Sequence, residues 1–130
     1  MSPYPTIFYA DDDSDDRTWV KEFILKKAPS ADLKEFEDGG QLLHFLRSDP
    51  GLLPDLVILD INMPVMSGKE VLVELRNSER WNNLKVVMFT NSSAEVDRLF
   101  AESMNAHFIT KPMSVEGIRQ VAERFLKLCY

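Results

Sequence analysis

The sequence predicts an α/β fold, a doubly wound five-stranded parallel sheet with five helices that cover it. Short apolar runs alternate with longer amphipathic stretches along the 130 residues. The strongest run, Leu56–Leu59, has no polar alternation, as expected for a strand whose two faces are both buried. Strands that alternate with helical patterns favour βαβ units and a parallel sheet, with crossovers that are almost always right-handed.

The first half of the chain supplies two strand–helix pairs. Thr6–Ala10 is a short apolar run typical of a strand. Ser14–Ala28 is a predicted helix that Pro29 ends, because its apolar residues recur at helical spacing, namely Trp19, Val20, Phe23 and Ile24. Leu33–Phe36 is a weaker strand, and Gly40–Ser48 is a helix with its leucines inward.

The second half continues from the central strand through a turn rich in proline and glycine. Lys69–Ser78 is a predicted helix, and Leu84–Thr90 is an apolar strand. Ala94–Met104 is a helix whose expected buried stripe consists of Val96, Leu99 and Phe100. Ala106–Thr110 is the last strand and Val115–Leu128 the last helix.

The composition narrows the classes of partner and compartment. The net charge is −6 and the sequence pI is about 4.9. Proteins bind nucleic acids and anionic membranes through clustered Lys and Arg. Because this chain is acidic, neither is an expected partner. The single cysteine, Cys129, excludes a disulfide within the chain. We find no apolar stretch long enough for a membrane span and no signal peptide, and we expect a cytoplasmic protein.

Five aspartates lie between Asp11 and Asp16, directly after the first predicted strand. Crowded carboxylates repel one another, which indicates a hard cation such as Mg2+ or Ca2+ at this strand end. Asp11 and Asp12 precede the helix and are the predicted metal ligands. The other three, Asp13, Asp15 and Asp16, suit the first turn of a helix, where acidic side chains cap it and oppose its dipole.

Other strand ends carry reactive groups too. Asp60 follows the third strand, Thr90 ends the fourth, and Lys111 follows the fifth. Ligands bind outside the carboxyl ends of the strands in such sheets, so these groups should share one rim with the aspartates at the first strand. Carboxylates, a hydroxyl and an ammonium group together suit phosphoryl chemistry on a carboxylate.

Four segments of the chain resemble a known family. IFYADDDSDD, VILDINMPVMSGKEVL, VVMFTNSS and FITKP are similar, in order and spacing, to receiver domains of two-component response regulators. The resemblance covers nearly the whole chain. It implies a flavodoxin-like (βα)5 sheet of strand order 2-1-3-4-5. Residues 1–130 are then expected to be one receiver domain without an output domain, like the single-domain regulators of chemotaxis.

The resemblance also implies roles for individual residues. Asp60 would accept a phosphoryl group from a histidine kinase or a histidine phosphotransfer protein. Asp11, Asp12, Asp60 and the backbone carbonyl of Asn62 would bind Mg2+. Lys111 and Thr90 would contact the phosphoryl group, and the Lys111–Pro112 bond is expected to be cis.

A switch and its partners follow from the same resemblance. When Thr90 moves toward the phosphoryl group, Phe108 would rotate inward. The face formed by the fourth helix, the fifth strand and the fifth helix would then change shape for a downstream target protein. The protein would be a monomer or a phosphorylation-dependent dimer through that face. It would act on no external metabolite and would not be an enzyme in that sense.

Three rival readings stay open. A phosphatase of the haloacid dehalogenase type also phosphorylates an aspartate, but it needs an acidic residue two positions later, where this chain has Asn62. A degenerate receiver would bind partners without phosphorylation. A flavodoxin-like electron carrier would need a phosphate-binding loop after the first strand, where this chain has aspartates.

His44 and His107 lack companions at ligand spacing and are expected to be structural or solvated.

Overall fold

Strands and helices alternate through the computed structural model, which describes residues 4–130. The strands are β1 (Thr6–Ala10), β2 (Asp32–Phe36), β3 (Leu56–Leu59), β4 (Val86–Thr90) and β5 (His107–Thr110). The helices are α1 (Ser14–Lys27), α2 (Gly39–Ser48), α3 (Gly68–Arg76), α4 (Glu95–Ser103) and α5 (Val115–Leu128). The order of elements is the predicted one, and the boundaries differ from the predicted boundaries by at most two residues.

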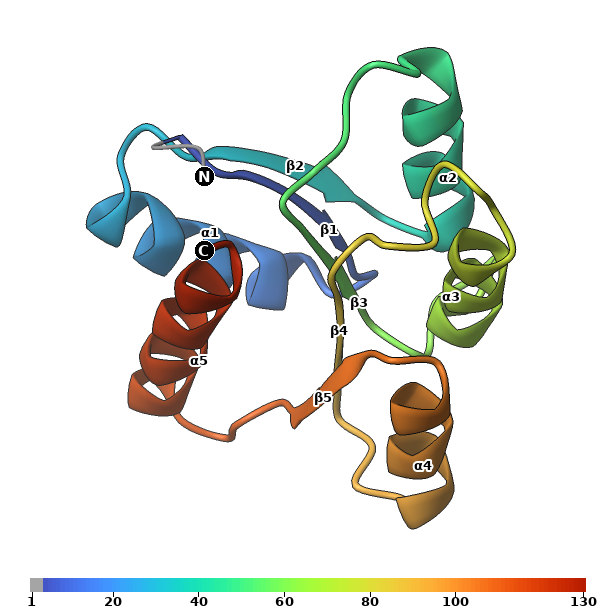
Figure 1. Cartoon of the computed structure of the whole chain (residues 1–130). Helices are drawn as coiled ribbons and strands as arrows, with labels where there is room; N and C mark the ends of the chain where they lie inside the picture. The colour runs from blue at the N-terminus through green and yellow to red at the C-terminus, as the bar shows by residue number, and fades with distance from the viewer. Residues whose placement is uncertain (1–3) are drawn as a thin grey trace.

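One parallel sheet of order β2-β1-β3-β4-β5 forms the middle layer, which confirms the predicted fold class and strand order. Helices α1 and α5 cover one face, and α2, α3 and α4 cover the other (Figure 1). The side chains of β1 alternate between the two layers. Phe8 and Ala10 join the core under α2–α4, whereas Ile7 and Tyr9 join the core under α1 and α5. Both faces of the strand are therefore buried, which explains its unbroken apolar sequence.

Side-chain caps fix where the helices begin. The Asp13 carboxylate accepts hydrogen bonds from the amides of Asp15 and Asp16 at 2.9 and 3.2 Å, which confirms the predicted cap of α1. Ser67 and Glu70 form a capping box at the start of α3. These caps set the first turns of α1 and α3 beside the ends of β1 and β3.

Helix α4 differs from its prediction. Val96 and Leu99, which were expected to be buried, are 68% and 52% exposed, and Ala101 is the buried residue of the helix. Helix α4 lies against the edge strand β5, at the border of the sheet (Figure 1), so a smaller part of its surface is buried. The exposed residues leave an apolar strip on the outside of α4.

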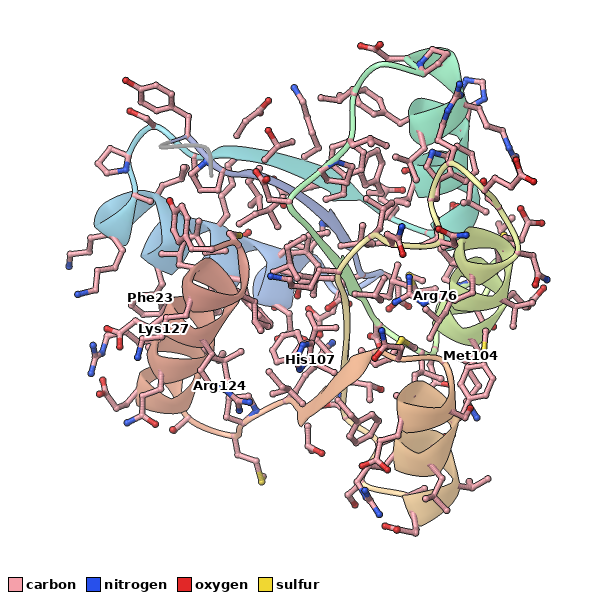
Figure 2. The ribbon with its side chains drawn as sticks, viewed as in Figure 1. Phe23, Arg76, Met104, His107, Arg124 and Lys127 are labelled. Atoms are coloured by element: carbon pink, nitrogen blue, oxygen red, sulfur yellow. The ribbon has the colours of Figure 1, made fainter. Side chains whose placement is uncertain are left out.

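A guanidinium ties α3 to the far end of α4. Arg76, at the end of α3, points toward Met104 (Figure 2) and donates to its carbonyl at 2.7 Å. The same group donates to the carbonyls of Asn82, Leu84 and Asn105. Arg76 thus holds the carboxyl end of α4 against the loop that precedes β4.

Within residues 4–130, no helix is long and apolar enough to cross a membrane.

Candidate functional site

The carboxyl ends of the strands converge on one acidic pocket. Its volume is about 370 Å³, and it is lined by Asp12, Asp13, Asp60, Asn62, Thr90, Asn91 and Lys111. Backbone pairing sets the positions of these residues, because the Asp60 amide donates to the Ala10 carbonyl at 3.0 Å and the Lys111 amide donates to the Thr90 carbonyl at 2.7 Å. The predicted rim is therefore one physical site.

Three carboxylates in this site face one another. Asp11, Asp12 and Asp60 each offer an oxygen atom within 4.8 Å of the others. Asp11 and Asp60 are buried, whereas Asp12 is exposed. Oxygen ligands in such proximity, one of them open to solvent, fit a hard divalent cation that keeps some of its water.

Asp11 is the most deeply placed of the three. Its Oδ1 accepts from the Asp13 amide at 2.9 Å, and its Oδ2 accepts from the Tyr9 hydroxyl at 2.8 Å. Burial raises the pKa of Asp11 above its ordinary value, and the negative charge of Asp60 raises it further, although hydrogen bonds from Lys111 and Asp13 act in the opposite direction. Burial and the neighbouring carboxylate thus both disfavour the charged form of Asp11, which a cation nearby would offset.

Lys111 is the cation that the chain itself places in the site. Its Nζ lies 2.8 Å from Asp11 Oδ2, 2.8 Å from Asp16 Oδ2 and 3.0 Å from Asp60 Oδ2. The side chain is 5% exposed. Burial alone would lower the pKa of Lys111, but its hydrogen bonds to Asp11 and Asp16 outweigh burial and raise the pKa above its ordinary value. Lys111 is therefore positively charged at every physiological pH.

Asp16 is the site residue that the sequence analysis missed. Its position in the first helical turn indicated only a helix-start role. The signal that could have found it is its place in the first turn of α1, four residues after Asp12, at the end of the helix that begins beside the predicted site. Asp13 keeps its predicted cap role and also lines the pocket.

Thr90 and Asn62 complete the rim. Thr90 is fully buried, and its hydroxyl oxygen accepts from the Ser92 amide at 3.3 Å. The Asn62 amide lies 3.4 Å from Asp60 Oδ1. Phe108 does not line the pocket, and it is half-buried against the core under α2–α4. His44 and His107 are both exposed and lie outside the pocket.

The expected cis bond is wrong, because the described residues 4–130 contain no cis peptide bond and Lys111–Pro112 is trans. The trans isomer of such a bond is favoured by about 0.5–1 kcal/mol. With the bond in this form, the Lys111 amide still pairs with Thr90 and the ammonium still reaches Asp60. The site geometry therefore does not require the less stable isomer.

The chain resembles known proteins along nearly its whole length. Residues 7–123 match the family described as response regulator receiver domain. A relative, the probable methanogenesis regulatory protein FilR2 of Methanothrix harundinacea, is 35% identical over 91 residues, which cover 66% of this chain and 58% of that protein. This chain thus spans little more than half of that relative.

Solved structures show the same fold. The phosphorylated cyanobacterial phytochrome response regulator RcpA has a TM-score of 0.87 at 24% identity, with 95% of this chain and 94% of that chain covered. The Mn2+-bound form of response regulator Rcp1 has a TM-score of 0.83 at 25% identity, with 92% and 90% covered. The span matched by the family model, residues 7–123, includes the residues of the acidic pocket and all five strands except Thr6, and the chain therefore belongs to the response regulator receiver domain family.

Proposed function

We propose that this receiver domain accepts a phosphoryl group on Asp60 from a histidine kinase or a histidine phosphotransfer protein. The observation that carries the proposal is the placement of the buried Asp60 carboxylate, which has an oxygen within 4.8 Å of oxygens of Asp11 and Asp12 and lies 3.0 Å from Lys111 Nζ. An ionised Asp60 oxygen would attack phosphorus, and the bond between phosphorus and the donor imidazole would break. The product is an acyl phosphate on Asp60 and a neutral histidine on the donor.

Asp11, Asp12, Asp60 and the backbone carbonyl of Asn62 would hold Mg2+. The ion would neutralise charge on the phosphoryl oxygens, which is the contribution that metals make to phosphoryl transfer. An all-oxygen set of ligands suits Mg2+ or Mn2+. The Mn2+-bound form of Rcp1, which shares the fold, supports a divalent ion as a ligand of this chain.

Thr90 and Lys111 would hold the oxygens of the phosphoryl group. Lys111 already donates to Asp60, so its ammonium needs little movement to reach an oxygen bound to that side chain. Thr90 lines the same pocket, and its hydroxyl currently accepts from the Ser92 amide. A move of Thr90 toward the phosphoryl group would loosen that contact and leave room for Phe108 to rotate.

The output would be a change in the α4-β5-α5 face, which a downstream protein would bind. Exposed apolar side chains on this side, Val96, Leu99 and Val115, support a protein partner. The same face could join two phosphorylated copies, and the unphosphorylated protein would be a monomer. The acidic composition argues against nucleic acid and anionic membrane as partners. The protein would act in the cytoplasm as a switch and not as a metabolic enzyme.

The test is covalent modification of Asp60. The protein is incubated with Mg2+ and acetyl phosphate, and intact-mass and peptide analysis should find one added phosphoryl group, located on Asp60. Asp60→Asn should prevent it, whereas Asp49→Asn, which changes an exposed carboxylate at the end of α2, should not. Equal labelling of wild type and Asp60→Asn would refute the phosphoacceptor role, and turnover of generic phosphomonoesters would favour a phosphatase.

A further inference from the structure

Among the described residues, Lys111 has one carboxylate partner that is neither a predicted metal ligand nor the phosphoacceptor. That partner is Asp16, whose Oδ2 lies 2.8 Å from Lys111 Nζ and whose side chain is 24% exposed. The two residues are 95 positions apart in the sequence. The contact joins the first turn of α1 to the end of β5.

The hydrogen-bonding capacity of the ammonium is fully used. An ammonium group has three N–H donors, and Lys111 faces three carboxylates, those of Asp11, Asp16 and Asp60. Asp11 and Asp60 belong to the three-carboxylate group that could hold a metal ion, and Asp16 does not. Asp11 Oδ2 additionally accepts from the Tyr9 hydroxyl, so that oxygen already serves two donors.

A divalent ion at this site would meet Lys111 as a competitor. The ion and the Lys111 ammonium would both contact the oxygens of Asp11 and Asp60, and two cations held by the same carboxylates repel each other. A carboxylate other than the shared ones would help to hold the ammonium in the site beside the ion. Asp16 is placed to do that, because it contacts the ammonium from α1 at 2.8 Å.

We propose that Asp16 is a positioning residue that anchors the Lys111 ammonium, so that a divalent ion and Lys111 can occupy the site together. This role rests on the proposed function, because it concerns the same ion and the same phosphoacceptor. Asp16 neither binds the ion nor touches the phosphoryl group. Its negative charge balances the Lys111 ammonium, so that Asp11 and Asp60 are not the only carboxylates that neutralise the lysine.

The test is Mg2+ affinity, measured by calorimetric titration of the metal-free protein. Asp16→Asn keeps the size of the side chain and removes its charge, which leaves Lys111 to compete for Asp11 and Asp60. We expect the Kd for Mg2+ to rise about three- to tenfold, as for the loss of one charge contact at a partly exposed site. An unchanged Kd would overturn the proposal.

Asp15→Asn is the matched control. Asp15 lies in the same helical turn, is exposed, and has no contact with Lys111 among the hydrogen bonds and ion pairs of the described residues. The substitution removes the same unit charge and the same helix-dipole interaction. Its expected effect on the Kd is about twofold or less, because exposed charges are screened. Equal losses in the two variants would mean a general charge effect and would overturn the role of Asp16.

A double-mutant cycle with Lys111→Met isolates the pathway. If Asp16 acts through Lys111, Asp16→Asn should change the Mg2+ affinity of Lys111→Met no more than Asp15→Asn does. If Asp16→Asn lowered the Mg2+ affinity of Lys111→Met as much as it lowers that of wild type, the proposal would be overturned. Should Lys111→Met fail to fold, the NMR signal of the Lys111 ammonium decides. On addition of Mg2+ it should stay sharp in wild type and broaden in Asp16→Asn, and equal behaviour would refute the anchor.

The outcomes also separate this proposal from the proposed function. If wild type takes a phosphoryl group on Asp60 and binds Mg2+, while Asp16→Asn binds it equally well, only the anchor role fails. If wild type binds no Mg2+, the metal half of the proposed function fails, and the anchor role fails with it.

Discussion

Gly68 lies so close to Asp60 that a β-carbon at position 68 would overlap the Asp60 carbonyl oxygen and lie 2.8 Å from its carbonyl carbon. Both neighbours are backbone atoms, so no flexible side chain can move aside. Gly68→Ala should therefore lower the free energy of unfolding by about 1–3 kcal/mol, the usual cost of overpacking. Urea denaturation followed by circular dichroism would measure it, and phosphorylation of Asp60 should slow because its backbone must shift.

Gly51→Ala is the control for that prediction. A β-carbon there would meet only Asp49 Oδ1 at 3.8 Å, which is an ordinary contact. The unfolding free energy should change by about 0.5 kcal/mol or less, or rise slightly because alanine restricts the unfolded chain. If Gly68→Ala proved as mild as Gly51→Ala, the close approach of α3 to the phosphoacceptor strand would not constrain the site.

The four carbonyl contacts of Arg76 make it a strong candidate for a stability determinant. Arg76→Met keeps much of the aliphatic stem but leaves the carbonyls of Met104, Leu84, Asn82 and Asn105 without their donor. We expect the unfolding free energy to fall by about 2–4 kcal/mol, since several polar groups lose a charged partner. Arg76→Lys should recover only part of it, because a lysine cannot reach several carbonyls in one plane.

Arg47→Met provides the comparison for Arg76. Arg47 pairs with Glu74 at 2.7 Å, but both side chains are about half exposed, at 57% and 44%. Exposed ion pairs contribute about 0–1 kcal/mol, so the loss in thermal or urea unfolding should stay in that range. Similar losses of unfolding free energy in Arg47→Met and Arg76→Met would contradict the role of Arg76 in holding α3 and α4 together.

The raised pKa of Asp11 predicts a pH-dependent cost of keeping this carboxylate buried. The native state binds a proton at Asp11 more readily than the unfolded chain does, so stability falls as pH rises from the unfolded pKa through the native one. Asp11→Asn cannot ionise, and Lys111 keeps Asp16 and Asp60 as partners in this variant. The variant should therefore unfold at a higher urea concentration than the metal-free wild type at pH 7. Urea unfolding with a chelator present would measure this gain.

That gain should shrink as pH is lowered through the native pKa of Asp11 toward the unfolded value of about 3.9. It should also shrink when Mg2+ is added to wild type, because a bound ion would stabilise the charged carboxylate. A constant difference between Asp11→Asn and wild type across pH would mean that the effect is steric and not electrostatic.

Cys129 should be an unreactive thiol. Burial, with a further contribution from the Asp55 charge, raises the pKa of Cys129 to about 11, so at pH 8 only about one thiol in a thousand is ionised. Alkylation by iodoacetamide should be at least about a hundredfold slower in the native protein than in urea, where an ordinary thiol ionises near pH 8.5. The chain has one cysteine, so mass spectrometry gives the extent directly. Fast labelling of native protein would contradict the burial.

Local patterns in the sequence were sufficient for the order of elements and for most of the site. Leu56–Leu59 is apolar throughout because both faces of β3 are covered, and such a run predicts a central parallel strand. Parallel strands end on one side of the sheet, so Asp11, Asp60, Thr90 and Lys111 could be assigned to one rim without coordinates. The crowded carboxylates predicted Asp11 and Asp12 as metal ligands, and the family resemblance implied that Asp60 is the phosphoacceptor.

The tertiary structure decided what depends on contacts between distant segments. Periodicity finds the apolar side of α4, but only its place over the edge strand leaves Val96 and Leu99 exposed. Asp16 looked like a helix-start residue, and it is one of three carboxylates on Lys111. A sequence specifies which groups a chain carries at its strand ends, whereas packing across 95 residues decides which carboxylate holds which cation.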